Sequence, residues 1–311
     1  MRILIVKPSS LGDIIQGLQI AQAIRESIPH ASISWVVRDI FAPMVQACPA
    51  VHRTYIFERH GGWVQFLKLI RTLREERYDA VLDMQGLFRS ALITRLVRAN
   101  RRLMHPITRE CAGWLVPSQL PMPPHPPGPH AVDCLRQFLP ALGVENKLSG
   151  KLILHSPELK SNVATFMTRH PVVMFPDSRR AEKEWPHFMG LTQRLLEHNP
   201  STSILWSGAD RREAPDLDSN PRFYNLTAHT TLAEMIPLVE HARMVVANDS
   251  GPMHLAAALE KPLVALFGPT PPERFGPYPL DNPRNRVMIA PRGDIAGLSV
   301  DSVFATVREV L

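Results

Sequence analysis

Near the amino terminus stands the stretch RILIVKPSSLGD, residues 2–13. Its first five residues form a short apolar run, which the polar segment from Lys7 to Asp13 interrupts. Apolar residues then return at helical spacing from Ile14 to Ile28, so the stretch predicts a strand, a turn and a helix. The turn has neither the G-x-G-x-x-G pattern of dinucleotide-binding folds nor the G-x-x-x-x-G-K-[ST] pattern of a P-loop, which argues against a dehydrogenase or a nucleotide triphosphatase.

The same alternation continues along the chain and predicts two parallel α/β sheets with helices on both faces. Ligands of such sheets bind beyond the carboxyl ends of the strands, so chemistry is expected in the strand-to-helix loops. In the first half, further strands are expected at residues 32–37, 51–57 and 79–83, with helices at 63–77, 88–103 and 131–142. In the second half, strands are expected at 172–175, 203–206, 222–226, 243–247 and 262–267, with helices at 158–169, 187–198, 231–242, 252–260 and 299–310.

Loop composition places the division between the two sheets. Seven of the 30 prolines fall between residues 117 and 129, which predicts a long surface loop, because proline suits neither a helix interior nor a central strand. Residues 144–157 are polar and aperiodic. Since the apolar alternation restarts after them, we expect two domains, residues 1–155 and residues 156–311.

Composition is that of an ordinary globular protein. The 311 residues are 45% hydrophobic and 21% charged, which excludes disordered and fibrous classes. Cys48, Cys111 and Cys134 are odd in number and widely spaced, so neither a disulfide framework nor a cysteine zinc site is expected. The first residues lack the apolar core of a secretory signal, and no apolar run approaches the ~20 residues of a membrane span. A cytoplasmic location is therefore expected.

The charge of the chain is one-sided. Residues 1–150 carry 18 Lys and Arg against 11 Asp and Glu, a net charge of +7, whereas the rest carries 17 against 18. Such a field is typical of a domain that meets nucleic acid, phospholipid or a phosphorylated substrate, although a solvated basic surface explains it equally well. Few aromatic residues and no known nucleic-acid-binding motif accompany it, so no nucleic acid is expected as a partner.

Two of the predicted loops contain acidic residues at the start of a helix. Asp13 would lie in the first helical turn, and its spacing alone favours a cap that satisfies backbone amides and the helix dipole. The segment ANDSGPMH, residues 247–254, follows an apolar strand, and Pro252 suits the first helical position. Asp249 or Ser250 would then cap the helix, and its free amides would form an anion site. A plain cap with a packed His254 is the alternative.

Two more loops have suitable composition for a ligand site. The loop at residues 176–186 places three cations beside Ser178, which suits phosphate oxygens, although an ordinary mixed-charge surface loop explains it as well. The loop at residues 267–278 is rich in glycine and proline and would frame a pocket wall rigidly.

Six motifs, in this order, resemble those of bacterial ADP-heptose:lipopolysaccharide heptosyltransferases, glycosyltransferase family 9, and the opening is nearest to the type that adds the first heptose. They span nearly the whole chain: RILIVKPSSLGD at 2–13, YDAVLDMQGLFRS at 78–90, Arg109-Glu110, Lys183 with Trp185 and Pro186, Asp249-Ser250-Gly251-x-x-His254, and FGPT at 267–270.

The resemblance implies a GT-B fold, an α/β architecture of two Rossmann-like parallel-sheet domains that face each other across a cleft. Residues 1–155 would bind the acceptor and residues 156–311 the nucleotide-sugar. It implies an inverting transfer of heptose from ADP-heptose to a phosphorylated Kdo-lipid A acceptor in lipopolysaccharide core biosynthesis, with no metal and no other cofactor. The net charge of the first half is consistent with such an acceptor.

The resemblance also implies the roles of individual residues. Asp13 would be the catalytic base, with its proton affinity raised by burial, and Lys183 would neutralise the leaving diphosphate. Donor-binding residues would be Ser178, Asp249, Ser250, Gly251, His254 and Thr270, with the loop at 207–213 near the adenosine. Acceptor-binding residues would be Ser10, Gly12, Arg89 and Arg109. The chain has Gln16 and Gln19 where the family has a histidine and a proline, so its acceptor contacts differ there.

Alternatives of other classes are a family relative that uses another nucleotide-sugar or a protein acceptor, and a non-catalytic nucleotide-sugar-binding module. The helix expected at 63–77 combines an apolar stripe with neighbouring cations, which suits an anionic membrane surface. The stripe consists of Trp63, Phe66, Leu67, Ile70 and Leu73. Packing of this stripe against the sheet is the favoured interpretation. Contact with the cytoplasmic face of the inner membrane would accordingly be weak and peripheral.

Overall fold

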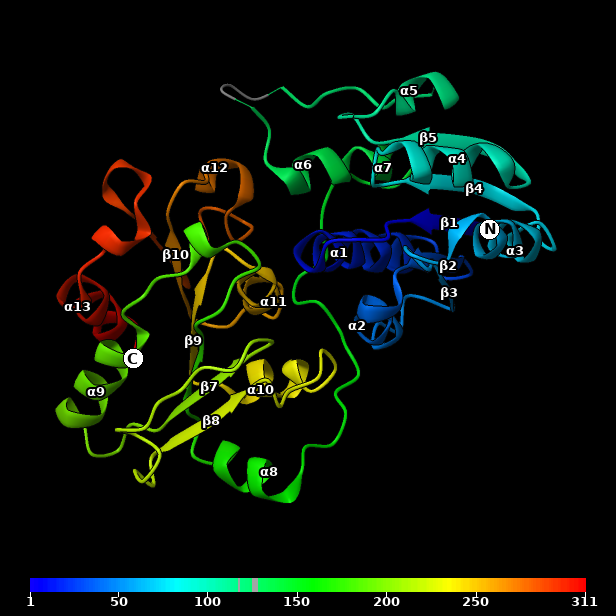
Figure 1. Cartoon of the computed structure of the whole chain (residues 1–311). Helices are drawn as coiled ribbons and strands as arrows, with labels where there is room; N and C mark the ends of the chain where they lie inside the picture. Colours follow the sequence, from blue (N-terminus) through cyan, green and yellow to red (C-terminus); the bar gives the residue numbers. More distant parts are fainter. Residues whose placement is uncertain (117, 125–127) are drawn as a thin grey trace. The chain divides into compact units, whose positions relative to one another are not determined.

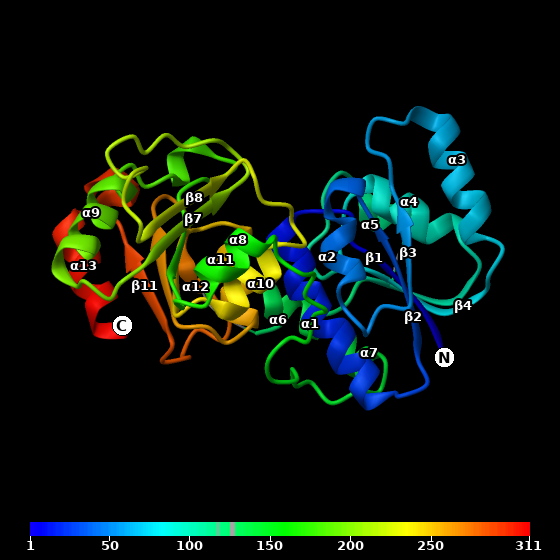
Figure 2. The same ribbon diagram turned by 90° about the horizontal axis from the view of Figure 1, so that it is seen from below.

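The structure is a computed structural model that describes residues 1–116, 118–124 and 128–311. The chain divides into two compact units, Met1–His155 and Ser156–Leu311. Each unit contains one wholly parallel sheet with helices on both faces (Figures 1 and 2). Within the described ranges, no helix combines the length and the apolar character that a membrane span requires.

The first unit has a five-stranded sheet with the order β3-β2-β1-β4-β5. Helices α1 and α2 cover one face, and α3 and α4 cover the other (Figures 1 and 2). The strands are β1 (Arg2–Val6), β2 (Ser32–Val37), β3 (Arg53–Ile56), β4 (Tyr78–Asp83) and β5 (Ala99–Met104). The helices are α1 (Leu11–Ser27), α2 (Ala42–Gln46), α3 (Gly62–Leu73), α4 (Phe88–Leu96), α5 (Ala112–Leu115), α6 (Ala131–Arg136) and α7 (Phe138–Ala141).

Alternation along β1 builds this core. Leu4 and Val6 point to the same face and pack with Leu73 of α3 and Ile93 of α4, and all four side chains are buried. Ile3 and Ile5 are also fully buried, on the opposite face. A strand apolar on both faces must lie in the middle of a covered sheet, which is where β1 is found.

The second unit has a six-stranded sheet with the order β11-β10-β9-β6-β7-β8. Its strands are β6 (Val172–Phe175), β7 (Ile204–Gly208), β8 (Phe223–Thr227), β9 (Met244–Asn248), β10 (Leu263–Phe267) and β11 (Asn285–Ile289). Its helices are α8 (Ser161–Met167), α9 (Phe188–His198), α10 (Met235–His241), α11 (Gly251–Ala258), α12 (Pro272–Phe275) and α13 (Val300–Val310). Met174, Val246 and Leu266 from three adjacent strands pack with Leu195 of α9 and Phe304 of α13.

Both sheets reverse their strand order at one point, between β1 and β4 in the first unit and between β6 and β9 in the second. At such a point the neighbouring connections run to opposite faces and leave a crevice at the carboxyl ends of the strands. The loops after β1, β4, β6 and β9 are therefore the positions where each unit can bind a ligand.

The sequence predictions were wrong in three places. The helix expected at 88–103 ends at Leu96, and Ala99–Met104 is the edge strand β5, whose arginines are tolerated because an edge strand keeps one side open to solvent. The edge strand β11 was not predicted. The helix expected at 131–142 is two short helices, α6 and α7. Residues 117 and 125–127 of the predicted proline-rich loop lie outside the described residues.

The favoured interpretation of the α3 stripe holds for only part of it, because Phe66, Ile70 and Leu73 pack toward the sheet and the other members do not. Ile70 and Leu73 are buried against the sheet, but Trp63 and Leu67 are exposed. The stripe is wider than the contact with the sheet, and its first two turns extend beyond that contact.

Gly86 in the loop after β4 should not tolerate a side chain. Its φ angle is +68°, and an added Cβ would lie 2.5 Å from the backbone oxygen of Ile107. We expect Gly86→Ala to lower the free energy of unfolding by about 2 kcal/mol or more, as measured by urea denaturation. Gly113→Ala is the control, since its Cβ would make only ordinary contacts with the Thr108 hydroxyl at 3.5 Å and the Gln119 side-chain oxygen at 3.9 Å. Equal stabilities of the two variants would contradict the prediction.

Candidate functional site

The loop between β1 and α1 holds Asp13 at the start of a long helix. Ser10 is the N-cap, and its backbone N–H and its hydroxyl donate to Asp13 Oδ2 at 3.0 and 2.5 Å. Lys7 Nζ lies 3.3 Å from Asp13 Oδ1. The Lys7 side chain is 5% exposed and that of Asp13 is 41% exposed, so the ammonium is buried while the carboxylate reaches solvent. Gly12 is buried in the same helical turn.

These contacts keep Asp13 ionised. Burial by itself raises the pKa of Asp13. The charge of Lys7 and the hydrogen bonds from Ser10 together outweigh burial and lower the pKa to about 2. The expectation of a raised proton affinity for Asp13 was therefore wrong in its net direction, because the sequence alone did not indicate that Lys7 folds back onto the carboxylate and outweighs the effect of burial. Asp13 does satisfy a backbone amide at the helix start, that of the N-cap Ser10, and its exposed side still leaves it accessible to a ligand.

Asp83 ends β4 beside this loop and is completely buried. Its Oδ1 accepts hydrogen bonds from the backbone N–H groups of Gln85 and Gly86, at 3.0 and 2.9 Å. Its Oδ2 has no hydrogen-bond partner among the described residues. Burial outweighs these hydrogen bonds and raises the pKa of Asp83 to about 6. The sequence analysis missed Asp83, although its position at the end of a central strand was a usable signal.

His105 follows β5 and lies near the same group of side chains. Its Nδ1 is 3.0 Å from the backbone nitrogen of Ile107. Burial and the charge of Lys7 lower the pKa of His105 to about 4, so the ring is neutral at pH 7. The Lys7 ammonium thus affects the pKa of Asp13, Asp83 and His105. Lys7 and His105 are functional candidates that the sequence analysis did not assign.

The two arginines predicted to bind the acceptor are both exposed. Arg109 lies beside the Asp83 loop, since its backbone N–H donates to the carbonyl oxygen of Gly86 at 2.9 Å. Arg89, in the first turn of α4, donates to the carbonyl oxygen of Arg59 at 3.3 Å and lines a cavity of about 180 Å³ next to Trp63. The structure thus brings Ser10, Gly12 and Asp13 together, with Arg109 bordering the neighbouring loop, and places Arg89 at a separate cavity.

In the second unit, Lys183 and Asp249 form a buried ion pair. Lys183 ends the 3₁₀ turn η2 (Ala181–Lys183) after β6, and Asp249 follows β9. Lys183 Nζ lies 2.5 Å from Asp249 Oδ2, and their side chains are 14% and 6% exposed. The Thr270 hydroxyl donates to the same oxygen at 2.5 Å. Three residues predicted separately thus form one hydrogen-bonded group at the carboxyl edge of the sheet.

Two further contacts fix the loop after β6. Asn248 is fully buried, accepts from the backbone N–H of Trp185 at 3.1 Å and donates to the carbonyl oxygen of Pro176 at 3.1 Å. The backbone N–H of Ser178 donates to Glu184 at 2.8 Å, which turns the loop back on itself. Asn248 therefore connects the ends of β9 and β6 across the point where the strand order reverses.

The helix α11 begins at Gly251 with Ser250 as its N-cap. The Ser250 hydroxyl oxygen is buried and has no hydrogen-bond partner among the described residues. Pro252 occupies the first turn, where its missing N–H costs nothing, and His254 lies in the same turn, half-buried. The amides of this turn and the positive end of the helix favour an anion beside Ser250 and Gly251.

No group of three or more His, Cys, Asp or Glu side chains that could hold a metal ion occurs in the part of the chain that the structure describes. Lys183 is the cation that the geometry places beside Asp249, just before the start of α11.

Comparison with known proteins identifies the family. The family model described as glycosyltransferase family 9 (heptosyltransferase) matches residues 66–293. The lipopolysaccharide heptosyltransferase 1 of Pseudomonas aeruginosa is 31% identical over 296 residues, which cover 89% of this chain and 81% of the relative. The chain belongs to glycosyltransferase family 9. The lipopolysaccharide heptosyltransferase 1 of Escherichia coli K12 is 28% identical, with 98% of each chain covered.

Solved structures show the same fold. The Escherichia coli heptosyltransferase WaaC with ADP has a TM-score of 0.82 at 24% identity, and all of both chains is covered. The Escherichia coli ADP-heptose lps heptosyltransferase II has a TM-score of 0.76 at 22% identity, over 100% of this chain and 98% of that one. The enzyme is thus a glycosyltransferase with the two Rossmann-like domains of the GT-B fold class, as the sequence motifs implied.

The Lys183–Asp249 pair should contribute strongly to the stability of the enzyme. Lys183→Ala leaves the Asp249 carboxylate buried without its counter-charge, so we expect a loss of about 3 kcal/mol in the free energy of unfolding, measured by chemical denaturation. Arg284→Ala is the matched control, because Arg284 and its partner Glu260 are 54% and 42% exposed and their pair should contribute less than about 1 kcal/mol. Similar losses in both variants would show that burial does not strengthen the first pair.

Asp83 should make stability depend on pH. Its folded-state pKa of about 6 lies above the ordinary 3.8, so the folded chain binds more protons than the unfolded chain between these values, and stability is lost as the pH rises through 6. Asp83→Asn cannot ionise and should gain up to about 3 kcal/mol relative to the wild type between about pH 4 and about pH 7. Urea denaturation across this range measures the difference. Parallel stability curves would show that Asp83 titrates normally.

Proposed function

We propose that the enzyme transfers heptose from ADP-heptose to the Kdo-lipid A inner core during lipopolysaccharide biosynthesis. Membership of glycosyltransferase family 9 supports this reaction. The relatives named lipopolysaccharide heptosyltransferase 1 also support it, because this chain matches them over most of their length. The observation that carries the proposal is the half-exposed carboxylate of Asp13, held ionised at the carboxyl edge of the first sheet.

The second unit is the proposed donor domain. A diphosphate carries two or more negative charges, and the first turn of α11 offers backbone amides and the positive end of a helix. Thr270 and Asp249 lie within the hydrogen-bonded group beside this turn, where Asp249 would bind sugar hydroxyls. Ser178 supplies a hydroxyl from the loop after β6. The solved structure of WaaC with ADP, a relative in fold, is consistent with a nucleotide diphosphate as the leaving group.

Lys183 is the proposed electrostatic catalyst. When the bond between the anomeric carbon and the diphosphate breaks, negative charge increases on the leaving oxygen, and a buried ammonium stabilises that charge more than water does. In the resting structure this ammonium is paired with Asp249. Binding of the diphosphate would therefore exchange one anionic partner of Lys183 for another.

The first unit is the proposed acceptor domain. The acceptor hydroxyl would attack the anomeric carbon with inversion and give its proton to Asp13. A carboxylate with a pKa of about 2 is fully ionised at neutral pH, so it is always in the form that accepts a proton. Because the attacking hydroxyl becomes far more acidic as its new bond forms, a weak base in contact with it is sufficient. Arg109 and Ser10 would position the phosphorylated acceptor.

Asp13→Asn should abolish most of the turnover without unfolding the enzyme. The amide keeps the shape of the side chain but cannot accept the proton, so we expect kcat to fall about 100- to 10,000-fold. The measurement is ADP release with ADP-heptose and Kdo-lipid A, with other nucleotide-sugars and a protein acceptor run alongside. Asp79→Asn is the matched control, since Asp79 is exposed at the opposite end of β4. Near-normal turnover of a folded Asp13→Asn variant would refute the base assignment.

A further inference from the structure

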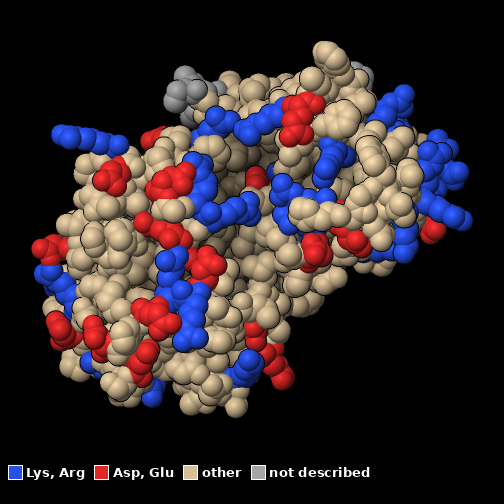
Figure 3. Space-filling view, in the orientation of Figure 1, with Lys and Arg blue, Asp and Glu red and all other residues tan. Residues whose placement is uncertain are grey.

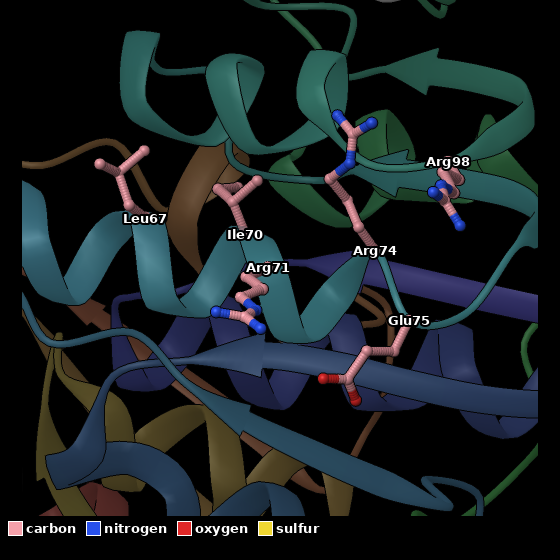
Figure 4. Close-up of a pocket in the computed structure, with 6 residues that line it drawn as sticks. All are labelled: Leu67, Ile70, Arg71, Arg74, Glu75 and Arg98. Atoms are coloured by element: carbon pink, nitrogen blue, oxygen red, sulfur yellow. The ribbon is translucent and has the colours of Figure 1, made fainter.

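A groove rich in arginine lies on the first unit, away from the proposed catalytic loops. Two adjoining cavities of about 500 and 390 Å³ share Arg74 and Arg98, and together they form what we call the arginine groove. Figure 4 shows the larger cavity between α3 and the segment that joins α4 to β5. The arginines that line the groove are Arg71, Arg74, Arg77, Arg95, Arg98 and Arg102.

The positive charge of this groove is largely uncompensated. Glu75 is the one acidic residue that lines either cavity, and none of the six arginines forms an ion pair with a carboxylate of the described residues. Arg74 donates to the carbonyl oxygen of Leu96 and Arg102 to that of Thr94, contacts that hold the guanidinium groups in place without neutralising them. Figure 3 shows Lys and Arg side chains gathered over the side of this unit that holds α3. Such a concentration of like charge favours an anionic partner.

The exposed face of α3 joins apolar side chains to this groove. Trp63, Leu67 and Arg71 are spaced four residues apart and so lie on one helix face. Trp63 is 70% exposed and Leu67 59% exposed, and Val64 beside them is 78% exposed. Exposed apolar side chains followed by cations on the same helix face combine the two contributions to binding at a membrane surface, burial of apolar area and attraction to anionic lipids.

We propose that this face of α3 and the arginine groove dock the protein on an anionic phospholipid surface. Trp63, Val64 and Leu67 would enter the boundary between headgroups and acyl chains, while Arg71, Arg74 and Arg98 contact lipid phosphates. The aliphatic members of the exposed group favour lipid over nucleic acid, because Val64 and Leu67 gain nothing from a phosphate backbone but gain free energy when acyl chains cover them. The docking surface is separate from the proposed donor and catalytic residues.

Vesicle flotation of the full chain tests the proposal. The wild type should bind vesicles of phosphatidylcholine mixed with phosphatidylglycerol, bind pure phosphatidylcholine far more weakly, and detach as salt is raised. A triple variant with Arg71→Ala, Arg74→Ala and Arg98→Ala should bind the mixed vesicles about 100-fold more weakly, roughly fivefold for each charge. The matched control replaces Arg25, Arg286 and Arg308 by alanine, which removes the same charge from exposed positions elsewhere and should bind like the wild type.

A second measurement locates the inserted residues. Lipids carrying bromine on their acyl chains should quench part of the tryptophan fluorescence, and Trp63→Phe should remove that quenchable part. Turnover with a water-soluble, deacylated acceptor should be unchanged in the arginine variant, so a failure of docking is distinguishable from a failure of the proposed reaction. Equal vesicle binding by the triple variant and its control, or binding of an RNA duplex while vesicles stay unbound, would overturn the proposal.

Discussion

The candidate site of the first unit depends on the ion pair between the buried ammonium of Lys7 and the carboxylate of Asp13. Burying a charged side chain that is only 5% exposed is costly unless an opposite charge lies beside it, and the loop after β1 supplies Asp13 at 3.3 Å. The capping geometry of Ser10 fixes the carboxylate in that position. Because Lys7 also lowers the pKa of Asp83 and of His105, one charge at the end of a central strand influences every titratable group near it.

The second unit also pairs a largely buried lysine with an aspartate, but here the two residues come from different loops. Lys183 comes from the turn after β6 and Asp249 from the end of β9, and Asn248 connects the two loops through Trp185 and Pro176. Both units thus place a lysine–aspartate pair where their strand order reverses. The pairs differ in exposure: Asp13 reaches solvent, whereas Asp249 is nearly enclosed. This difference is consistent with the proposed roles of Asp13 as a proton acceptor and of Asp249 as the resting counter-charge of Lys183.

The sequence could predict those features that depend on local pattern. Alternation of apolar runs and helical stripes was sufficient for the central strands, because burial on both faces leaves a clear apolar signal. Edge strand β5 was not predicted, because its exposed side carries Arg101 and its sequence continues the basic pattern of α4 without a break. Motif resemblance named Asp13, Lys183 and Asp249. It did not indicate the lowered pKa of Asp13, nor the burial of Asp83, because both arise from contacts made only in the folded chain.

The ion pair between Lys183 and Asp249 explains how a positive charge can stay in a largely buried position before a ligand binds. An unpaired lysine at the position of Lys183 would be costly to bury, and an exposed one would be screened by water and lose much of its field. Pairing with Asp249 gives the ammonium an opposite charge in this nearly enclosed position, and the hydrogen bond from Thr270 holds the carboxylate oriented. In the proposed reaction, an incoming diphosphate would have to bind Lys183 more favourably than Asp249 does. The amides at the start of α11 would supply the difference, because the proposed diphosphate would contact them as well as Lys183.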